Sequence, residues 1–163
     1  MENKKIITQK ISSCLWFNDN AKEAVNFYTS VFKNSKIGSI THYGKNTPMP
    51  EGTVLTIGFQ LEGVDFLALN GGPSFSFSEA ISFVVSCDNQ AEIDYYWMKL
   101  SDGGQIQQCG WLKDKFGVSW QIVPVQLGEM LQSKDSEKSN NVLQAIMQMV
   151  KIDIEKLEAA FRG

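Results

Sequence analysis

The chain has 163 residues, of which 43% are hydrophobic and 20% are charged, and its formal net charge is −3. This length and composition fit one globular domain that can bury a core without disulfide or metal staples. The slightly acidic balance argues against a nucleic-acid partner, which favours a basic face. No apolar run reaches the roughly 20 residues that a bilayer span needs, so we expect no membrane partner.

The N-terminus and the cysteines favour a cytoplasmic protein. The first residues, Met-Glu-Asn-Lys-Lys, lack the apolar stretch and the small-residue cleavage site of a secretory signal. The three cysteines, Cys14, Cys87 and Cys109, are few, odd in number and set in largely apolar surroundings. We therefore expect buried, reduced thiols and no disulfide.

The first part of the chain predicts the element order βαβββ. Residues 11–17 are rich in apolar and aromatic side chains and predict a strand. Asn20, with Glu23 three positions later, predicts a capping-box helix start, and apolar residues at helical spacing continue the helix to about residue 32. Three further strands, separated by loop- and turn-forming residues, are expected over residues 37–43, 54–61 and 65–70.

The same pattern recurs later in the chain. Residues 13–31 align with residues 82–100 at a constant offset of 69, which pairs Ser13 with Ser82 and Glu23 with Glu92. After a connector over 71–78, a helix from Asn89 to about residue 103 is flanked by strands over residues 81–87, 105–109, 110–112 and 118–124. The repeat predicts an α+β fold of two tandem βαβββ modules, at about 8–72 and 79–125, forming a curved sheet around a cavity within a single domain.

The residues after the repeat differ in kind. Residues 128–163 predict a helical tail, with helices over 137–150 and 153–161. Ile154 and Leu157 help to form an apolar face on the second helix. Two roles fit this tail: a packing or dimer element, or a helix that covers an open sheet edge of its own chain.

Several sequence runs carry a family resemblance. They are LWFNDNA at 15–21, NFY at 26–28, ALNGGP at 68–73, EAISFV at 79–84, CGWLKD at 109–114 and FGVSWQIVP at 116–124. Together, and in this order, they resemble the glyoxalase/bleomycin-resistance (vicinal oxygen chelate) superfamily, and within it the PhnB-like family. Members are often labelled demethylubiquinone methyltransferases. We do not carry that label over, because the sequence has no glycine-rich strand-to-helix turn suited to S-adenosylmethionine.

The resemblance implies a divalent metal held by His and Glu side chains from the first and last strand of each module. The corresponding positions are Ser13, Asn70, Ser82 and Gln121, and none is a histidine or a carboxylate. Zinc, nickel and iron sites need imidazole, thiolate or carboxylate donors. The single histidine, His42, lies outside these positions. We therefore expect no metal, no cofactor and no catalytic residue.

The same positions predict a ligand site. If Ser13 points into the cavity, strand alternation sends Leu15 and Phe17 the same way and turns Cys14 and Trp16 toward the helix. By the same rule Val84 follows Ser82 inward, and Ser119 accompanies Gln121. An apolar trough with a few neutral polar groups suits a small, partly apolar organic ligand. The expected ligand-binding residues are Ser13, Leu15, Phe17, Asn70, Ser82, Val84, Trp111 and Gln121.

Three functions remain open from the sequence. The favoured hypothesis is a metal-free homodimer that binds a small molecule in the cavity between the modules. The second is an enzyme of the same superfamily, of lyase, isomerase or dioxygenase type, whose metal has non-standard ligands. The third is a structural or regulatory dimer without a ligand, in which side chains fill the trough.

Overall fold

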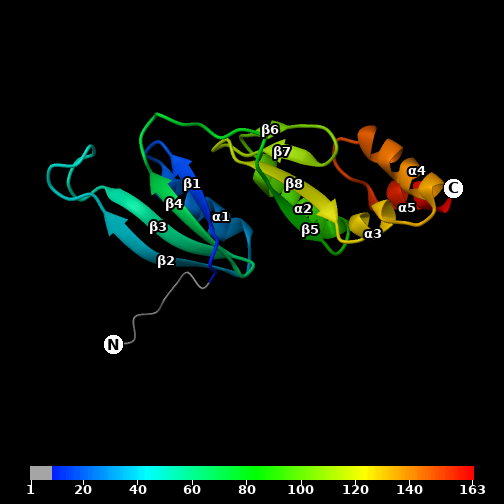
Figure 1. The fold of residues 1–163 in the computed structure, drawn as a ribbon, viewed down its shortest axis with the longest axis horizontal. Coiled ribbons are helices and arrows are strands. Elements are labelled where there is room, and N and C mark those ends of the chain that lie inside the picture. Colours follow the sequence, from blue (N-terminus) through cyan, green and yellow to red (C-terminus); the bar gives the residue numbers. More distant parts are fainter. Residues whose placement is uncertain (1–8) are drawn as a thin grey trace. The chain divides into compact units, whose positions relative to one another are not determined.

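The computed structural model describes residues 9–163. The expected start of the first module at residue 8, and the N-terminal residues inspected for a secretory signal, lie outside this range. The chain divides into two compact units between Ser76 and Phe77, within the expected connector (Figure 1). Each unit holds one βαβββ module, and helices follow the second, so the predicted α+β fold of two modules with a helical tail is confirmed. Within residues 9–163, no helix combines the length and the apolar character needed to cross a membrane.

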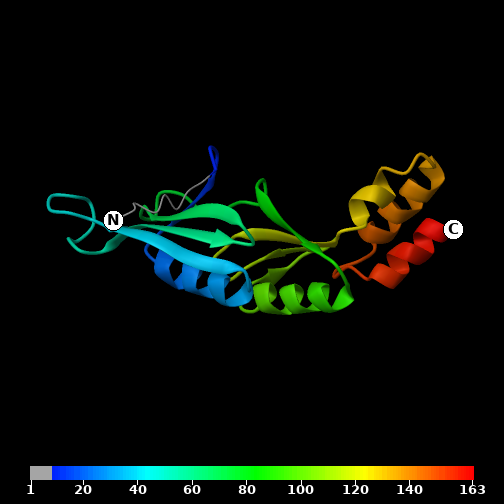
Figure 2. The same ribbon diagram turned by 90° about the horizontal axis from the view of Figure 1, so that it is seen from below.

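The first unit is a four-stranded sheet in the order β1-β4-β3-β2, with β1 and β4 parallel and the other pairs antiparallel. One helix lies along one face of this sheet (Figure 2). Residues 54–61 alternate as expected from the sequence and form one strand without interruption. The elements are β1 (Ser13–Phe17), α1 (Ala21–Val31), β2 (Ser35–His42), β3 (Val54–Leu61) and β4 (Val64–Asn70).

Ring stacking and strand register identify the face of this sheet that α1 covers. Tyr28 of α1 stacks on Phe59 of β3, with ring centroids 6.3 Å apart. The register sets Phe59 opposite Phe66 of β4, and Phe66 opposite Ser13 of β1. Paired residues share a face, and side chains alternate along a strand. Ser13, Leu15 and Phe17 therefore lie on the helix-covered face, and Cys14 and Trp16 lie on the open face.

The orientation expected for β1 is therefore wrong, and the cause is one residue in the corner before the helix. Three residues separate Phe17 from α1, whereas two separate Cys87 from α2 (Gln90–Ser101). The helix starts are thus offset by 69 (21 to 90), but the ends of the preceding strands are offset by 70 (17 to 87). A shift of one residue moves every side chain of a strand to the other face.

The two helix starts also differ. In the second module Asn89 Oδ1 accepts from the Glu92 N–H at 3.0 Å, and Glu92 Oε2 accepts from the Asp88 N–H at 2.8 Å. A cap of the predicted kind therefore forms there. In the first module the Asn20 side chain makes no cap, and Asn70 Oδ1 accepts from the Ala21 N–H at 2.9 Å. The prediction of a cap at Asn20 is wrong because a residue from β4 supplies the acceptor.

The second unit repeats the architecture, with the sheet order β5-β8-β7-β6 and a parallel β5–β8 pair. The helix-covered face contains fully buried Leu112 and Ile122, and Trp120, which packs against Phe83 at 5.4 Å. The strand expected over 105–109 is shorter, because Cys109 and Gly110 adopt positive φ angles of 61° and 79°. The strands are β5 (Ser82–Cys87), β6 (Gln105–Ile106), β7 (Trp111–Lys113) and β8 (Ser119–Pro124).

The tail packs on its own second unit. The N–H groups of Cys109 and Gly110 donate to the carbonyls of Met149 and Val150, both at 2.8 Å. Ile152 is fully buried, and a Cβ on Gly110 would lie only 2.9 Å from its Cγ1. This close approach explains the glycine. The tail helices are α3 (Leu127–Leu131), which the sequence pattern did not reveal, α4 (Ser136–Met147) and α5 (Ile154–Arg162).

The turn between β7 and β8 depends on one buried carboxylate. Asp114 is 3% exposed. Its Oδ1 accepts from the N–H groups of Phe116 at 2.8 Å and Val118 at 3.0 Å. Its Oδ2 accepts from Trp120 Nε1 at 2.8 Å. The side chain thus ties the turn to the core of the second unit.

We predict that Asp114→Ala lowers the free energy of unfolding by about 2–4 kcal/mol, because three N–H donors lose their acceptor in a buried setting. Urea denaturation measures this loss. The matched control is Asp102→Ala, at an exposed turn position, which is expected to change stability by less than about 0.5 kcal/mol. Equal effects of the two substitutions would contradict the role assigned to Asp114.

The face assignment of β1 predicts the order of cysteine reactivity. Cys14 is exposed, whereas Cys87 is fully buried and its pKa is raised to about 12, chiefly by burial. We expect iodoacetamide at pH 8 to label Cys14 in the folded protein and to leave Cys87 unlabelled, as peptide mapping by mass spectrometry would show. Urea-unfolded protein, in which both should react, is the control. Protection of Cys14 in the folded state would place it under the helix and overturn the assignment.

Candidate functional site

The candidate residues of the first unit lie on its helix-covered face. Leu15 and Phe17 are 6% and 3% exposed and belong to the core. Asn70 is buried, and besides capping α1 it donates from Nδ2 to the Val54 carbonyl at 3.1 Å. Ser13, at the start of β1, is half-buried on the same face. We expected these four side chains to face the cavity. The register of β1 and β4 corrects this expectation, because it places them on the face that α1 covers.

The open face of the first sheet presents other residues. Cys14 is exposed, and Trp16, Leu67 and Leu69 are half-buried. Trp16 donates from Nε1 to the Gly72 carbonyl at 2.9 Å, and its ring meets the Phe75 ring edge-on at 4.9 Å. The register adds Thr56, Gln60 and Asp65 to this face, where Gln60 Nε2 donates to Asp65 Oδ1 at 2.8 Å, so the face combines apolar and bonded polar side chains.

The structure brings the four candidates of the second unit together on the open face of its sheet. Gln121 of β8 lies between Val84 of β5 and Trp111 of β7 in the strand register. Gln121 Nε2 donates to Ser82 Oγ at 2.9 Å. Val84 is 56% exposed, and the other three side chains are half-buried. The result is an amide–hydroxyl pair set beside exposed and aromatic apolar surface.

Two further residues belong to this face. Ser119 is directly opposite Ser82 on one side and Lys113 on the other. Ser119 is 1% exposed, and its Oγ has no hydrogen-bond partner among the described residues. Alternation along β8 had indicated that Ser119 points inward, but it was not counted as a ligand residue. Lys113 was missed, although it lies two positions after Trp111 and so shares its face.

The charge of Lys113 is compensated locally. Its Nζ lies 2.5 Å from Glu79 Oε1, and Gln107 Nε2 donates to the same oxygen at 3.3 Å. The hydrogen bond from Lys113 is the main reason why the pKa of the Glu79 carboxyl lies below its usual value. Because the pair carries no net charge, the open face of the second sheet is close to neutral.

These residues do not fit a resident divalent metal. Ser82 and Gln121 provide a neutral hydroxyl and a neutral amide that already bond to each other, where the superfamily positions call for imidazole and carboxylate. Among residues 9–163, no three His, Cys, Asp or Glu side chains gather as a possible ion site. His42, the single histidine of the sequence, is exposed on β2.

Two of the cysteines, Cys14 and Cys87, lack the features of nucleophiles. All three are free thiols. Burial raises the pKa of Cys14 and is also the main cause of the raised pKa of Cys87, to which Glu92 and Asp88 contribute. A catalytic thiol needs a lowered pKa, usually from a neighbouring cation or base. The geometry therefore offers no nucleophile at these two positions.

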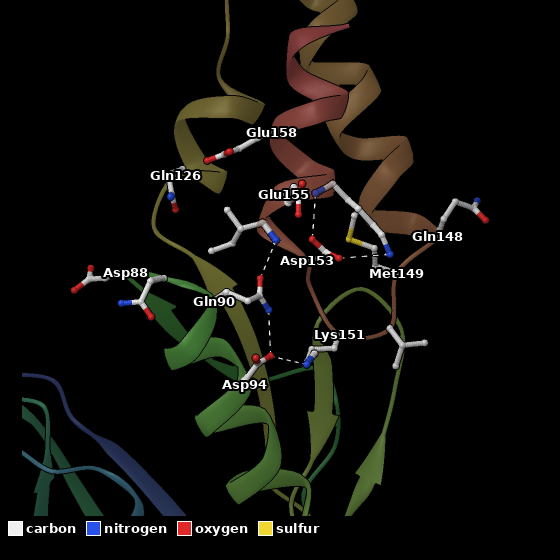
Figure 3. A pocket seen from close by; sticks show the side chains of 14 residues that line it. Asp88, Gln90, Asp94, Gln126, Gln148, Met149, Lys151, Asp153, Glu155 and Glu158 are labelled. Atoms are coloured by element: carbon white, nitrogen blue, oxygen red, sulfur yellow. Dashed lines mark hydrogen bonds and ion pairs between the residues drawn. The ribbon is translucent and has the colours of Figure 1, made fainter.

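A pocket of about 870 Å³ lies where the tail meets the second module (Figure 3). The Gln90 side chain connects α2 to the tail beside this pocket. Its Nε2 donates to the Ile152 carbonyl at 3.1 Å, and its Oε1 accepts from the Ile154 N–H at 2.9 Å. Lys151 pairs with Asp94, and this hydrogen bond is the main cause of the lowered pKa of Asp94. None of the eight predicted ligand residues lines this pocket. Gln90 and Lys151 hold the tail to the module there, and Gln126 Oε1 is buried without a hydrogen-bond partner among residues 9–163.

Comparison with known proteins agrees with this fold. A profile of the family described as 3-demethylubiquinone-9 3-methyltransferase matches residues 9–123, which leaves the tail outside the match. A solved structure from Bacillus cereus, described as a putative 3-demethylubiquinone-9 3-methyltransferase, PhnB protein, is 40% identical. It covers 72% of this chain and 100% of its own, with a TM-score of 0.66. No curated protein matches the chain.

More distant structures share the fold alone. Protein PA1353 from Pseudomonas aeruginosa is 20% identical over 72% of this chain and 98% of its own, with a TM-score of 0.59. The fosfomycin resistance protein FosX from Listeria monocytogenes is 15% identical over 78% of this chain and 99% of its own, with a TM-score of 0.54. With the matched profile, the 40% identical relative and the paired βαβββ modules, the chain belongs to the PhnB-like 3-demethylubiquinone-9 3-methyltransferase family.

Proposed function

We propose that this protein binds a small, uncharged and partly apolar organic molecule on the open face of its second sheet, without a resident metal. The observation that carries the proposal is the set of Val84, Trp111 and the hydrogen-bonded Gln121–Ser82 pair on one helix-free face. Ligand sites are typically apolar surfaces with a few placed polar groups. Exposed apolar surface beside placed polar groups is a feature of binding surfaces, and Val84 is 56% exposed next to the Gln121–Ser82 pair.

The chemistry of these side chains favours binding over catalysis. Ser82 and Gln121 can donate and accept hydrogen bonds, but neither is an acid, a base or an activated nucleophile at neutral pH. The Lys113–Glu79 ion pair compensates its own charge. These features support a site that selects a neutral guest. The methyltransferase description of the family finds no support in the side chains of this face.

The proposal includes the homodimer and the cytoplasmic location expected from the sequence. Leu143 and Met147, four residues apart on α4, are 47% and 60% exposed and offer an apolar contact surface. Light scattering of the purified full chain measures the assembly state directly.

The donor set predicts the metal content. Protein purified without chelator is expected to contain no stoichiometric zinc, nickel, manganese or iron by elemental analysis. The double variant Ser82→His/Gln121→Glu is expected to gain measurable zinc affinity, because the two positions are within hydrogen-bond distance on one face. The control Gln121→Glu alone should gain none, since a single carboxylate does not make a zinc site. A stoichiometric ion in the wild type would favour a metalloenzyme instead.

Binding is tested by screening neutral aromatic and aliphatic fragments with amide-detected NMR on the full chain. Hits are expected to shift the resonances of Ser82, Val84, Trp111 and Gln121. Val84→Glu should weaken binding at least tenfold by placing a charge on apolar surface, whereas Val64→Glu, at a 45% exposed valine of the first unit, should not. A ligand at 100 times its dissociation constant stabilises the fold by about 2.7 kcal/mol. The proposal would be refuted if hits shifted resonances outside the open face, or if Val84→Glu left their affinity unchanged.

A further inference from the structure

Two buried side-chain atoms of the second unit, Ser119 Oγ and Gln126 Oε1, have no hydrogen-bond partner among residues 9–163, and only Ser119 lies on the open face of the sheet. Ser119 is 1% exposed. Most buried polar atoms in native proteins are bonded, because an unmet donor or acceptor loses its water without compensation. Ser119 lies on the face to which we assign ligand binding, so a ligand group is a natural partner for this hydroxyl.

The neighbours of Ser119 are donors. Lys113, Ser119 and Ser82 lie directly opposite one another across β7, β8 and β5, and form one polar row on this face. Ser82 Oγ accepts from Gln121 Nε2, which leaves its own O–H free to donate. Ser119 can donate as well. The row therefore favours a ligand atom that accepts hydrogen bonds.

The charge around the row favours an uncharged acceptor. Glu79 lies 2.5 Å from Lys113 Nζ and receives a second hydrogen bond from Gln107. An anionic ligand would have to compete with Glu79 for Lys113 and would gain little from a cation that is already paired. A carbonyl oxygen accepts from two hydroxyls without that competition.

The adjacent row of side chains determines how the ligand is oriented on the sheet. Trp111, Gln121 and Val84 lie across the same three strands, two residues from the polar row. An aromatic or aliphatic body would rest on Trp111 and Val84 while its polar end reaches Ser119. Ser119 is 1% exposed, and Ser82 and Lys113 lie directly opposite it, so binding of this kind requires a side-chain rearrangement that exposes the hydroxyl.

We propose that the ligand carries an uncharged carbonyl group, which accepts a hydrogen bond from Ser119 and lies in the row of Ser82, Ser119 and Lys113, with its apolar body over Trp111 and Val84. This inference rests on the proposed function. It adds the chemical class of the bound group and the residue that recognises it.

Three probes of similar size test it by NMR titration of the full chain: acetophenone, which has the carbonyl; ethylbenzene, which lacks it; and benzoate, which is charged. Acetophenone is expected to bind roughly two- to tenfold more tightly than ethylbenzene, as one additional hydrogen bond allows. Benzoate is expected to bind more weakly than acetophenone. Probes that bind should shift the resonances of Trp111 and Val84. Only acetophenone should also shift the amide resonance of Ser119.

Ser119→Ala is expected to abolish the preference for acetophenone over ethylbenzene. It should fold with a melting temperature at least equal to that of the wild type, because it removes an unpartnered buried hydroxyl. The matched control Ser86→Ala, at an exposed serine on the open face of β5, should retain the preference.

The outcomes separate this inference from the function on which it rests. If acetophenone and ethylbenzene bind the open face equally, the carbonyl assignment fails and ligand binding stands. If benzoate binds most tightly, the uncharged assignment fails. If no probe at 10 mM shifts any resonance of the open face, both the inference and the proposed function are overturned.

Discussion

Each sheet of this protein is covered by a helix on one face only, and side chains alternate along every strand. The register of the first strand therefore decides which residues form the core and which remain available to a ligand. In the first module this constraint buries Leu15 and Phe17 and exposes Cys14. In the second module it leaves Val84 on the uncovered face. A single residue in a corner is enough to exchange the two sets.

The extra corner residue also accounts for the role of Asn70. Asn20 takes a backbone conformation in which its side chain makes no cap, and the amide of Asn70 reaches the start of α1 instead. Both polar atoms of that amide are then used within the first unit. The residue expected to contribute to a ligand site is thus a structural link between β4, α1 and β3, since an amide with both ends bonded in a buried position has little left to offer a ligand.

In the second module the tail is attached beside the turn before β7, and one face of the sheet has no helix on it. The tail is fastened by backbone hydrogen bonds from Cys109 and Gly110 and by the Gln90 side chain, so much of the polar lining of the pocket at that junction is already bonded, Gln126 Oε1 excepted. The open face differs in carrying exposed apolar surface at Val84. Its polar groups are neutral or paired, and one of them, Ser119 Oγ, is buried without a partner among the described residues. We assign ligand binding to the sheet because its polar groups lie beside the apolar side chains of Val84 and Trp111, and a structural role to the tail junction because Gln90 and Lys151 hold the tail there.

The sequence alone determined the two βαβββ modules, the family and the neutral character of the second module's site, because repeats, periodicity and motif words are local properties of the chain. Alternation along β5 and β8 also predicted that Ser82, Val84 and Gln121 face the same way, whereas the place of Trp111 beside Gln121 comes from the register of β7 and β8. Tertiary structure alone decided the orientation of Ser13, the capping by Asn70, the helix α3 and the attachment of the tail. These features depend on strand register and on contacts between residues far apart in the chain, such as Asn70 with Ala21, and an offset that fits the helices carries no information about the strands before them.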